Sequence, residues 1–134
     1  MDEKLDKELC QKFPKLYKDR NAPMNTTCMC WGFDVGTGWY NLIYNLSEKL
    51  EALINNLPQK DQEHFCAVQV KEKFGGLRFY MTSQTKEMSE EITKAESLSY
   101  HTCEDCGSNQ AKQNNEGWIS TLCSPCRKKR SQKK

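Results

Sequence analysis

Two pairs of cysteines near the C-terminal end constrain the fold of this chain more than any other feature of its sequence. Cys103 and Cys106 form the first pair, Cys123 and Cys126 form the second, and sixteen residues lie between them. Two Cys-x2-Cys pairs at this distance are typical of a zinc site in which each pair wraps two sulfur atoms around one ion. We therefore predict one structural zinc ion in a zinc ribbon over residues 100–126, with free thiols or disulfides as the alternatives.

The same site argues against zinc catalysis, because four protein ligands leave no position for an activated water. The zinc deaminase pattern also fails: Pro125 lies inside the second cysteine pair, and His64 is followed by Phe65. His64 and His101 are the two histidines of the chain, and neither lies near a nucleophile or carboxylate in a catalytic arrangement. We predict no catalytic residues and no enzymatic activity.

Four further cysteines stand outside the two pairs, namely Cys10, Cys28, Cys30 and Cys66. A second metal centre is one interpretation, but the one-residue gap between Cys28 and Cys30 is poorly suited to tetrahedral chelation. Buried free thiols, which act as small apolar side chains, are the favoured alternative. The sequence leaves the role of these four residues open.

Charge is unevenly distributed along the 134 residues. Residues 127–134 carry six Lys and Arg side chains and no acid, so the net charge of +2, less these six, leaves −4 for the rest. We expect an α+β domain over residues 1–99, then the zinc ribbon, then a disordered basic tail over residues 127–134. The N-terminus has no signal-like apolar run, and no later stretch approaches the roughly 20 apolar residues of a membrane span, so we expect a soluble cytoplasmic protein without a membrane partner.

The clearest predicted element is a central amphipathic helix over residues 38–57. Thr37 is the expected N-cap, and Pro58 ends the pattern. One stripe at helical spacing holds its apolar residues: Trp39, Ile43, Leu46, Leu50, Leu53, Ile54 and Leu57. A helix broken at Pro14 is predicted before it, and a polar connector helix over residues 84–99 after the sheet.

Apolar residues alternate with polar ones on both sides of Phe74-Gly75-Gly76, which predicts a β-hairpin. Its apolar face should lie on the central helix, and a two-stranded hairpin is marginal alone, so we expect a third strand or a partner chain. The opposite face should carry Gln69, Lys71, Lys73, Arg78 and Tyr80. The predicted fold is thus a central helix packed on an antiparallel hairpin or small sheet, with a four-cysteine zinc ribbon.

Three groups of residues are candidates for binding an anionic, aromatic ligand. Gly36-Thr37-Gly38 offers backbone amides at a helix start, where a phosphate can bind, although a flexible helix cap explains it equally well. Cations and an aromatic ring on the hairpin are Lys71, Lys73, Arg78 and Tyr80, with a solvated face as the alternative. Clustered aromatics are Trp39, Tyr40 and Tyr44, which are core residues unless one lines a pocket.

Several motifs together resemble a family of small bacteriophage and prophage proteins. They are Cys30-Trp31-Gly32-Phe33, Gly36-x-Gly38-Trp39-Tyr40, the run from Val70 to Tyr80, the two cysteine pairs and Gly117-Trp118-Ile119. The resemblance covers most of residues 13–126 and implies a phage protein acting in the host cell. By analogy with phage proteins that sequester nucleotide signals of host defence, it suggests a sponge-like role in immune evasion.

Three functional hypotheses follow, and a homo-oligomer is compatible with each. The leading one is a protein that binds a small anionic nucleotide through the aromatic and basic residues named above. The second is a zinc-ribbon DNA- or RNA-binding protein that uses Lys112, Arg127, Lys128, Lys129 and Arg130. The third is a protein-binding inhibitor of a host enzyme.

Overall fold

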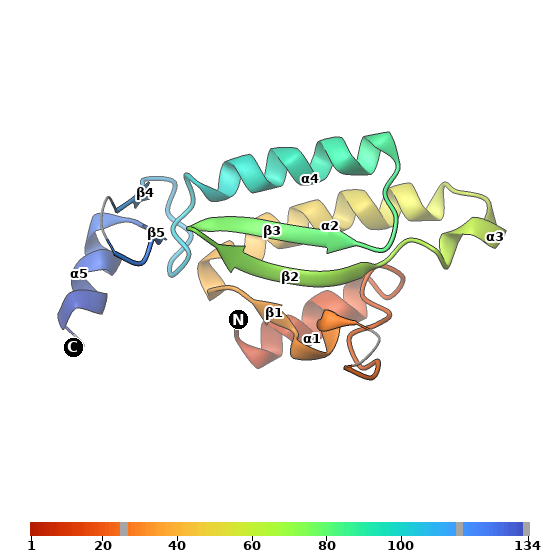
Figure 1. The fold of residues 1–134 in the computed structure, drawn as a ribbon, viewed down its shortest axis with the longest axis horizontal. Helices are drawn as coiled ribbons and strands as arrows, with labels where there is room; N and C mark the ends of the chain where they lie inside the picture. Colours follow the sequence, from red (N-terminus) through yellow and green to blue (C-terminus); the bar gives the residue numbers. More distant parts are fainter. Residues whose placement is uncertain (25–26, 115–116, 133–134) are drawn as a thin grey trace.

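The computed structural model describes residues 1–24, 27–114 and 117–132, and it confirms the predicted mixture of helices and a small sheet (Figure 1). One apolar core joins the helices α1 (Glu3–Lys12), α2 (Tyr40–Asn55) and α4 (Lys86–Ser99) to the strands β1 (Phe33–Asp34), β2 (Ala67–Lys73) and β3 (Gly76–Met81). The shorter helices of this body are η1 (Cys28–Trp31), η2 (Thr37–Trp39) and α3 (Gln59–Gln62). The C-terminal module consists of β4 (Lys112–Gln113), β5 (Thr121–Leu122) and α5 (Ser124–Gln132).

The sheet has the order β1-β2-β3, in which β1 is parallel to β2 and β2 is antiparallel to β3. Strand β1 supplies the third strand that the hairpin was expected to need, with Phe33 opposite Val70. Paired residues point to the same face of a sheet. Val70 and its partner Phe79 are therefore buried against the helices, whereas Lys71 and its partner Arg78 lie on the opposite face, which we call the outer face.

Helix α2 buries the predicted stripe, including Ile43, Leu50 and Ile54. The predicted cap is wrong, because the helix is preceded by the 3-10 turn η2 and has no side-chain cap. The Thr37 hydroxyl lies within η2 and instead accepts a long hydrogen bond of 3.4 Å from the backbone N–H of Asp2.

Helix α4 covers the open edge of β3 (Figure 1), so it is more than a connector. A carboxylate oxygen of Glu96 accepts the N–H of Phe79 at 3.0 Å, and the Ser99 hydroxyl accepts the N–H of Leu77 at 2.9 Å. An exposed strand edge is a template for unwanted pairing with another chain. Two side chains of α4 occupy N–H groups of this edge.

The turn after α1 is fixed by a buried carboxylate of α2. Glu51 accepts the backbone N–H groups of Lys15 at 3.1 Å and Leu16 at 2.8 Å. Pro14 prevents α1 from continuing and thereby leaves these N–H groups without helical partners. The body thus closes around α2, which holds α1 on one side and α4 on the other.

The tail that we expected to be disordered is helical as far as Gln132, because α5 is anchored by its arginines. The Arg127 guanidinium donates to the carbonyl oxygens of Lys112 at 2.6 Å and Ser120 at 3.3 Å. Arg130 donates to both carboxylate oxygens of Asp105, at 2.9 and 2.6 Å. Residues 133–134 of the predicted tail lie outside the described residues. None of the described helices has the length and apolar character needed to cross a membrane.

Candidate metal centre and outer sheet face

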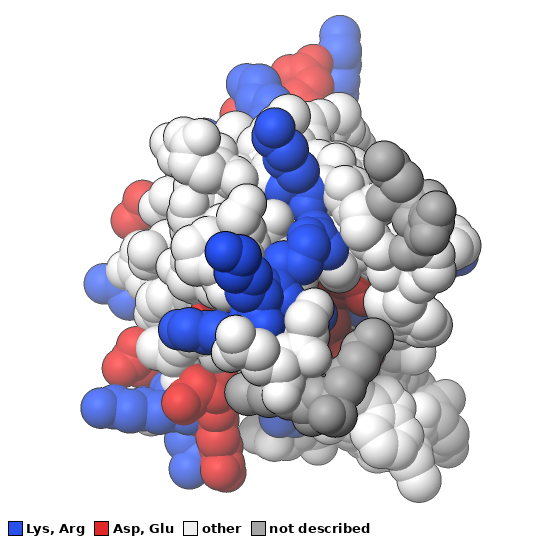
Figure 2. All heavy atoms as spheres, turned by 90° about the vertical axis from the view of Figure 1, so that its left-hand side faces the viewer, with Lys and Arg blue, Asp and Glu red and all other residues white. Residues whose placement is uncertain are grey.

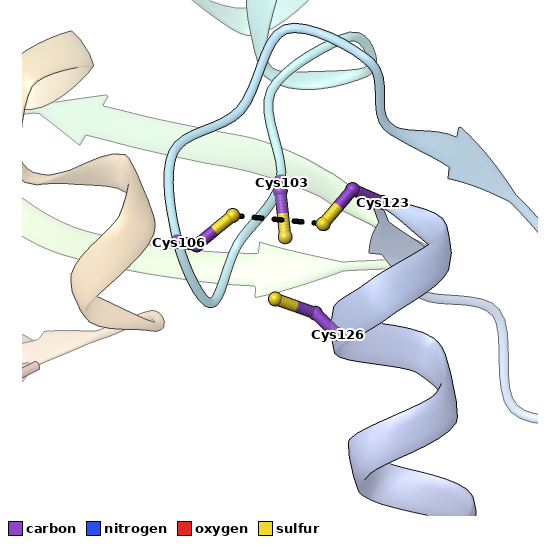
Figure 3. A group of neighbouring side chains, drawn as sticks. All are labelled: Cys103, Cys106, Cys123 and Cys126. Atoms are coloured by element: carbon purple, nitrogen blue, oxygen red, sulfur yellow. Dashed lines mark hydrogen bonds between the residues drawn. The ribbon is translucent and has the colours of Figure 1, made fainter.

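The four cysteines of the two pairs converge on one point (Figure 3). Cys103 and Cys106 lie on the loop after α4, Cys123 directly precedes α5, and Cys126 lies in its first turn. Their sulfur atoms are all within 4.8 Å of one another, and the sulfur atoms of Cys106 and Cys123 are 3.5 Å apart. A tetrahedral ion with metal–sulfur bonds of about 2.3 Å separates its ligands by about 3.8 Å. The geometry therefore fits a single metal ion.

The first pair sits on a tight backbone turn. The N–H of Gly107 donates to the carbonyl oxygen of Cys103 at 2.9 Å, and the N–H of Cys103 donates to the carbonyl oxygen of Ser108 at 2.7 Å. Gly107 has a φ of +84°, a left-handed conformation that side chains rarely adopt. The turn thus aims two sulfur atoms at the same point.

The surroundings of Cys103 favour its thiolate, whereas burial and the neighbouring thiols raise the pKa of Cys126. Burial would raise the pKa of the Cys103 thiol, but backbone N–H groups of Cys123, Cys106 and Asp105 outweigh this effect and lower the pKa to about 7. The thiolate is the form of cysteine that binds metals. Three of the four side chains are buried and Cys106 is exposed.

The glycine segment that we considered as a phosphate site holds a carboxylate of the chain itself. Glu104, inside the first cysteine pair, accepts the N–H of Gly36 through its side chain at 2.8 Å and the N–H of Gly38 through its backbone oxygen at 2.7 Å. A Cβ atom on Gly38 would lie 2.2 Å from the carbonyl oxygen of Cys103. The segment therefore docks the loop that carries Cys103 and Cys106, and the N–H groups of Gly36 and Gly38 are not available to a phosphate.

A second glycine segment docks the other side of the module. The hydroxyl of Thr121 donates to the carbonyl oxygen of Gly75 at 2.5 Å in the β2–β3 turn. A Cβ atom on Gly76 would lie 2.4 Å from the ring of Tyr100. The module has a small apolar cluster of its own, yet it is joined to the body at both places.

Of the seven side chains predicted to bind ligand, four share the outer face: Lys71, Lys73, Arg78 and Tyr80. Lys71 lies directly opposite Arg78, and Gln69 lies opposite the exposed Tyr80. The Arg78 guanidinium donates to the hydroxyl of Tyr100 at 3.2 Å. Among the described residues, Lys71, Lys73 and Arg78 form no ion pair within 4.0 Å.

The other three side chains lie elsewhere, so the seven do not form one site. Trp39 has an exposed fraction of 0 %, and its indole N–H donates to the carbonyl oxygen of Thr102 at 2.8 Å. Trp39 is thus a core residue that secures the metal-binding loop. Tyr40 and Tyr44 face α1, where the Tyr40 hydroxyl donates to Glu8 at 3.1 Å and the Tyr44 ring packs edge-on against Phe13.

Two aromatic residues that we had not assigned to ligand binding, Phe74 and Trp118, are the most prominent on this side. They border a groove of about 370 Å³. The residues that line it are Lys71, Glu72, Lys73, Phe74, Gly117, Trp118 and Ile119. From their position between the two cysteine pairs, we expected Trp118 and Ile119 to supply the apolar cluster of the module. This expectation is wrong, because Trp118 is 83 % exposed and Ile119 is exposed as well. The hairpin pattern in the sequence could have predicted that Phe74 is exposed, because this residue falls in the turn. No sequence pattern, however, places Trp118 beside Phe74.

Comparisons with models of protein families, with curated proteins and with solved structures gave no match. Function is therefore inferred from the residues and their arrangement alone.

Proposed function

We propose that the four-cysteine centre holds a structural zinc ion. Tetrahedral sites with four sulfur ligands take zinc or iron, and zinc is the usual ion where two Cys-x2-Cys pairs of a small module supply all four. Cys103, Cys106, Cys123 and Cys126 would hold the ion, which would stabilise a module that is too small to fold on its apolar cluster alone. Metal analysis of the purified protein should find one zinc ion per chain.

We further propose that the chain is a non-enzymatic binding protein for an anionic nucleotide, which it binds on the outer face beside the β2–β3 turn. The observation that carries this proposal is the state of Phe74. This residue has a φ of +54° and an exposed fraction of 65 %. A left-handed conformation costs an L-residue about 1–2 kcal/mol, and turns of this kind favour Asn or Gly. A strained, exposed aromatic residue in a two-residue turn is better explained by a ligand than by folding.

The cations around Phe74 support the same proposal. Lys73 places its ammonium nitrogen 5.6 Å from the centre of the Phe74 ring, and Lys71 lies opposite Arg78 on the neighbouring strand. Like charges directly opposite each other destabilise a sheet. Asp34 on β1 is the other cross-strand neighbour of Lys71, but the two form no ion pair. A bound phosphate would remove this repulsion.

Exposed aromatic rings beside these cations complete the features that a nucleotide requires. A base stacked on an aromatic side chain contributes about 1–3 kcal/mol. Exposed Phe74 and Trp118 border the groove beside the lysines, and exposed Tyr80 lies on the outer face, opposite Gln69. Binding alone would be enough to sequester a host-defence nucleotide, the role suggested by the resemblance to phage proteins, so sequestration forms part of the proposal.

Mass spectrometry of small molecules released from heat-denatured protein, together with titration of a nucleotide panel, would test the proposal. The double variant K71A/K73A should bind the recovered or best nucleotide at least about tenfold more weakly, because two charge-assisted contacts are lost. K60A/K86A is the matched control, since both lysines are exposed and lie outside the groove. Equal affinities for wild type and K71A/K73A would refute this placement of the site.

A further inference from the structure

A second group of cations lies in the C-terminal module, on β4 and α5. Lys112, Lys128 and Lys129 are exposed, whereas Arg127 and Arg130 use their guanidinium groups in bonds within the module. Figure 2 shows Lys and Arg side chains gathered at the centre of this end of the molecule. Residues 1–126 carry a net charge of −4, so the positive charge at this end does not extend over the whole protein.

The segment Gly117–Ser120 joins the two basic groups. Gly117, Trp118 and Ile119 line the groove beside Lys71 and Lys73. The next residue, Ser120, accepts hydrogen bonds from Arg127 of α5 through its carbonyl oxygen at 3.3 Å and its hydroxyl at 3.4 Å. The segment that carries Trp118 thus borders the groove and is also bonded to α5.

The shape of the groove indicates how long the ligand is. Pockets for small molecules bury most of the ligand surface, but the two aromatic residues that border this groove are 65 % and 83 % exposed. Exposed rings combined with a basic track are typical of proteins that bind single strands, in which successive bases stack and the phosphates follow the cations.

We propose that the nucleotide ligand of the outer face is part of a single-stranded nucleic acid; this inference rests on the nucleotide site proposed above and makes a strand, in place of a free small nucleotide, its preferred ligand. The strand stacks bases on Phe74 and Trp118. It places phosphates near Lys71 and Lys73 on one side of Trp118 and near Lys112, Lys128 and Lys129 on the other. Duplex DNA lacks splayed bases, so the rings cannot stack on it in this way.

Salt dependence gives the proposal a magnitude. Each phosphate neutralised on a single strand contributes about −0.7 to the slope of log affinity against log salt. Five lysine contacts predict a slope of about −3.5, which corresponds to roughly a hundredfold loss of affinity between 50 and 200 mM salt.

Fluorescence anisotropy with a labelled 12-nucleotide thymidine strand, with thymidine monophosphate as competitor, would test this inference. The strand should bind at least about tenfold more tightly than the monophosphate. K128A/K129A should weaken strand binding, reduce the slope by about 1.4, and leave the affinity for the monophosphate unchanged. W118A should weaken strand binding by about 5- to 100-fold, as expected for a lost base stack. Circular dichroism and metal content equal to those of wild type would show that each variant is folded.

The outcomes separate this inference from the proposed function. If strand and monophosphate bind equally well and K128A/K129A changes neither, the inference is wrong and the nucleotide site stands. If neither ligand binds, the inference fails, whereas the proposed function fails only if the nucleotide panel gives no binding either. If a duplex binds as tightly as the single strand and W118A has no effect, the attraction is to phosphate alone and the inference is overturned.

Discussion

Replacement of Gly38 by alanine should loosen the joint between the metal-binding module and the body. The new Cβ atom would lie 2.2 Å from the carbonyl oxygen of Cys103 and 2.6 Å from the carbonyl carbon and oxygen of Glu104. These neighbours are backbone atoms of the turn that carries Cys103 and Cys106 and is closed by backbone hydrogen bonds. The loop must therefore move away by more than about 1 Å to restore ordinary contact distances near 3.5 Å.

The hydrogen bonds of the joint set the size of the effect. Such a shift breaks the 2.7 Å bond from Gly38 to the Glu104 carbonyl and strains the 2.8 Å bond from Gly36 to the Glu104 carboxylate. A neutral bond contributes about 0.5–1.5 kcal/mol and a charged one about 1.5–3 kcal/mol. Alanine also lowers the conformational entropy of the unfolded chain relative to glycine, which adds about 0.4–1 kcal/mol to the free energy of unfolding. We expect a net loss of about 2–3 kcal/mol in the free energy of unfolding.

Urea unfolding of the metal-loaded protein, followed by circular dichroism, would measure this loss, and a chromogenic chelator would measure metal release. G38A should unfold at lower urea and release its metal faster than wild type. T37A is the matched control, because the Thr37 hydroxyl makes only a 3.4 Å bond to Asp2, and its stability should stay within about 0.5 kcal/mol of wild type. A G38A protein as stable as T37A, with unchanged metal release, would refute the docking role of this glycine segment.

Three further predictions test other parts of the structure. F74N should leave the free energy of unfolding within about 1 kcal/mol of wild type, because asparagine relieves the strain of the left-handed backbone and so offsets the loss of a partly buried ring. The same variant should weaken nucleotide binding at least about fivefold. A loss of stability above about 2 kcal/mol would make Phe74 a structural residue. E51A should lower the free energy of unfolding, measured in urea, by about 2–4 kcal/mol, because the N–H groups of Lys15 and Leu16 lose their acceptor. E48A is the control, since Glu48 is exposed on the same helix. A loss below about 1 kcal/mol for E51A would refute this role of Glu51. Burial, aided by Asp6, raises the pKa of Cys10 to about 12, so about one molecule in 10⁴ carries the Cys10 thiolate at pH 8. Mass-spectrometric mapping after treatment with iodoacetamide should find exposed Cys28 alkylated first, and the alkylation rate of Cys10 should rise about tenfold per pH unit. Equal alkylation rates of Cys10 and Cys28 at pH 8 would contradict the raised pKa of Cys10.

The parts of the fold that depend on local periodicity could be predicted from the sequence. The stripe of α2 and the alternation of β2 and β3 each bury one face, and this requirement fixes both the element and the side that faces the core. The convergence of the four cysteines could be predicted for a similar reason, since the chemistry of thiolates restricts which spacings can surround one ion.

Contacts between distant segments were beyond the reach of the same reasoning. Gly36 and Glu104 are 68 residues apart, and a glycine before a helix looks alike whether its N–H binds a phosphate or a carboxylate of the same chain. Trp118 was misplaced because an aromatic residue between metal ligands resembles a core residue. The loop that carries it lies against the hairpin turn through Ile119 and Thr121, and no local pattern encodes that contact.

These long-range contacts change the expected role of the metal. If the module were an independent appendage, loss of the metal would unfold residues 100–126 and leave the outer face intact. In the structure, however, the loop between the two cysteine pairs forms one wall of the groove, and Thr121 holds that wall against Gly75 of the hairpin turn. A metal ion bound by the four cysteines would thus fix the wall that carries Trp118 relative to Lys71 and Lys73, although none of these cysteines lines the groove. Metal removal should consequently weaken ligand binding while the core around α2 stays folded, because the groove loses one wall but the sheet keeps its cations.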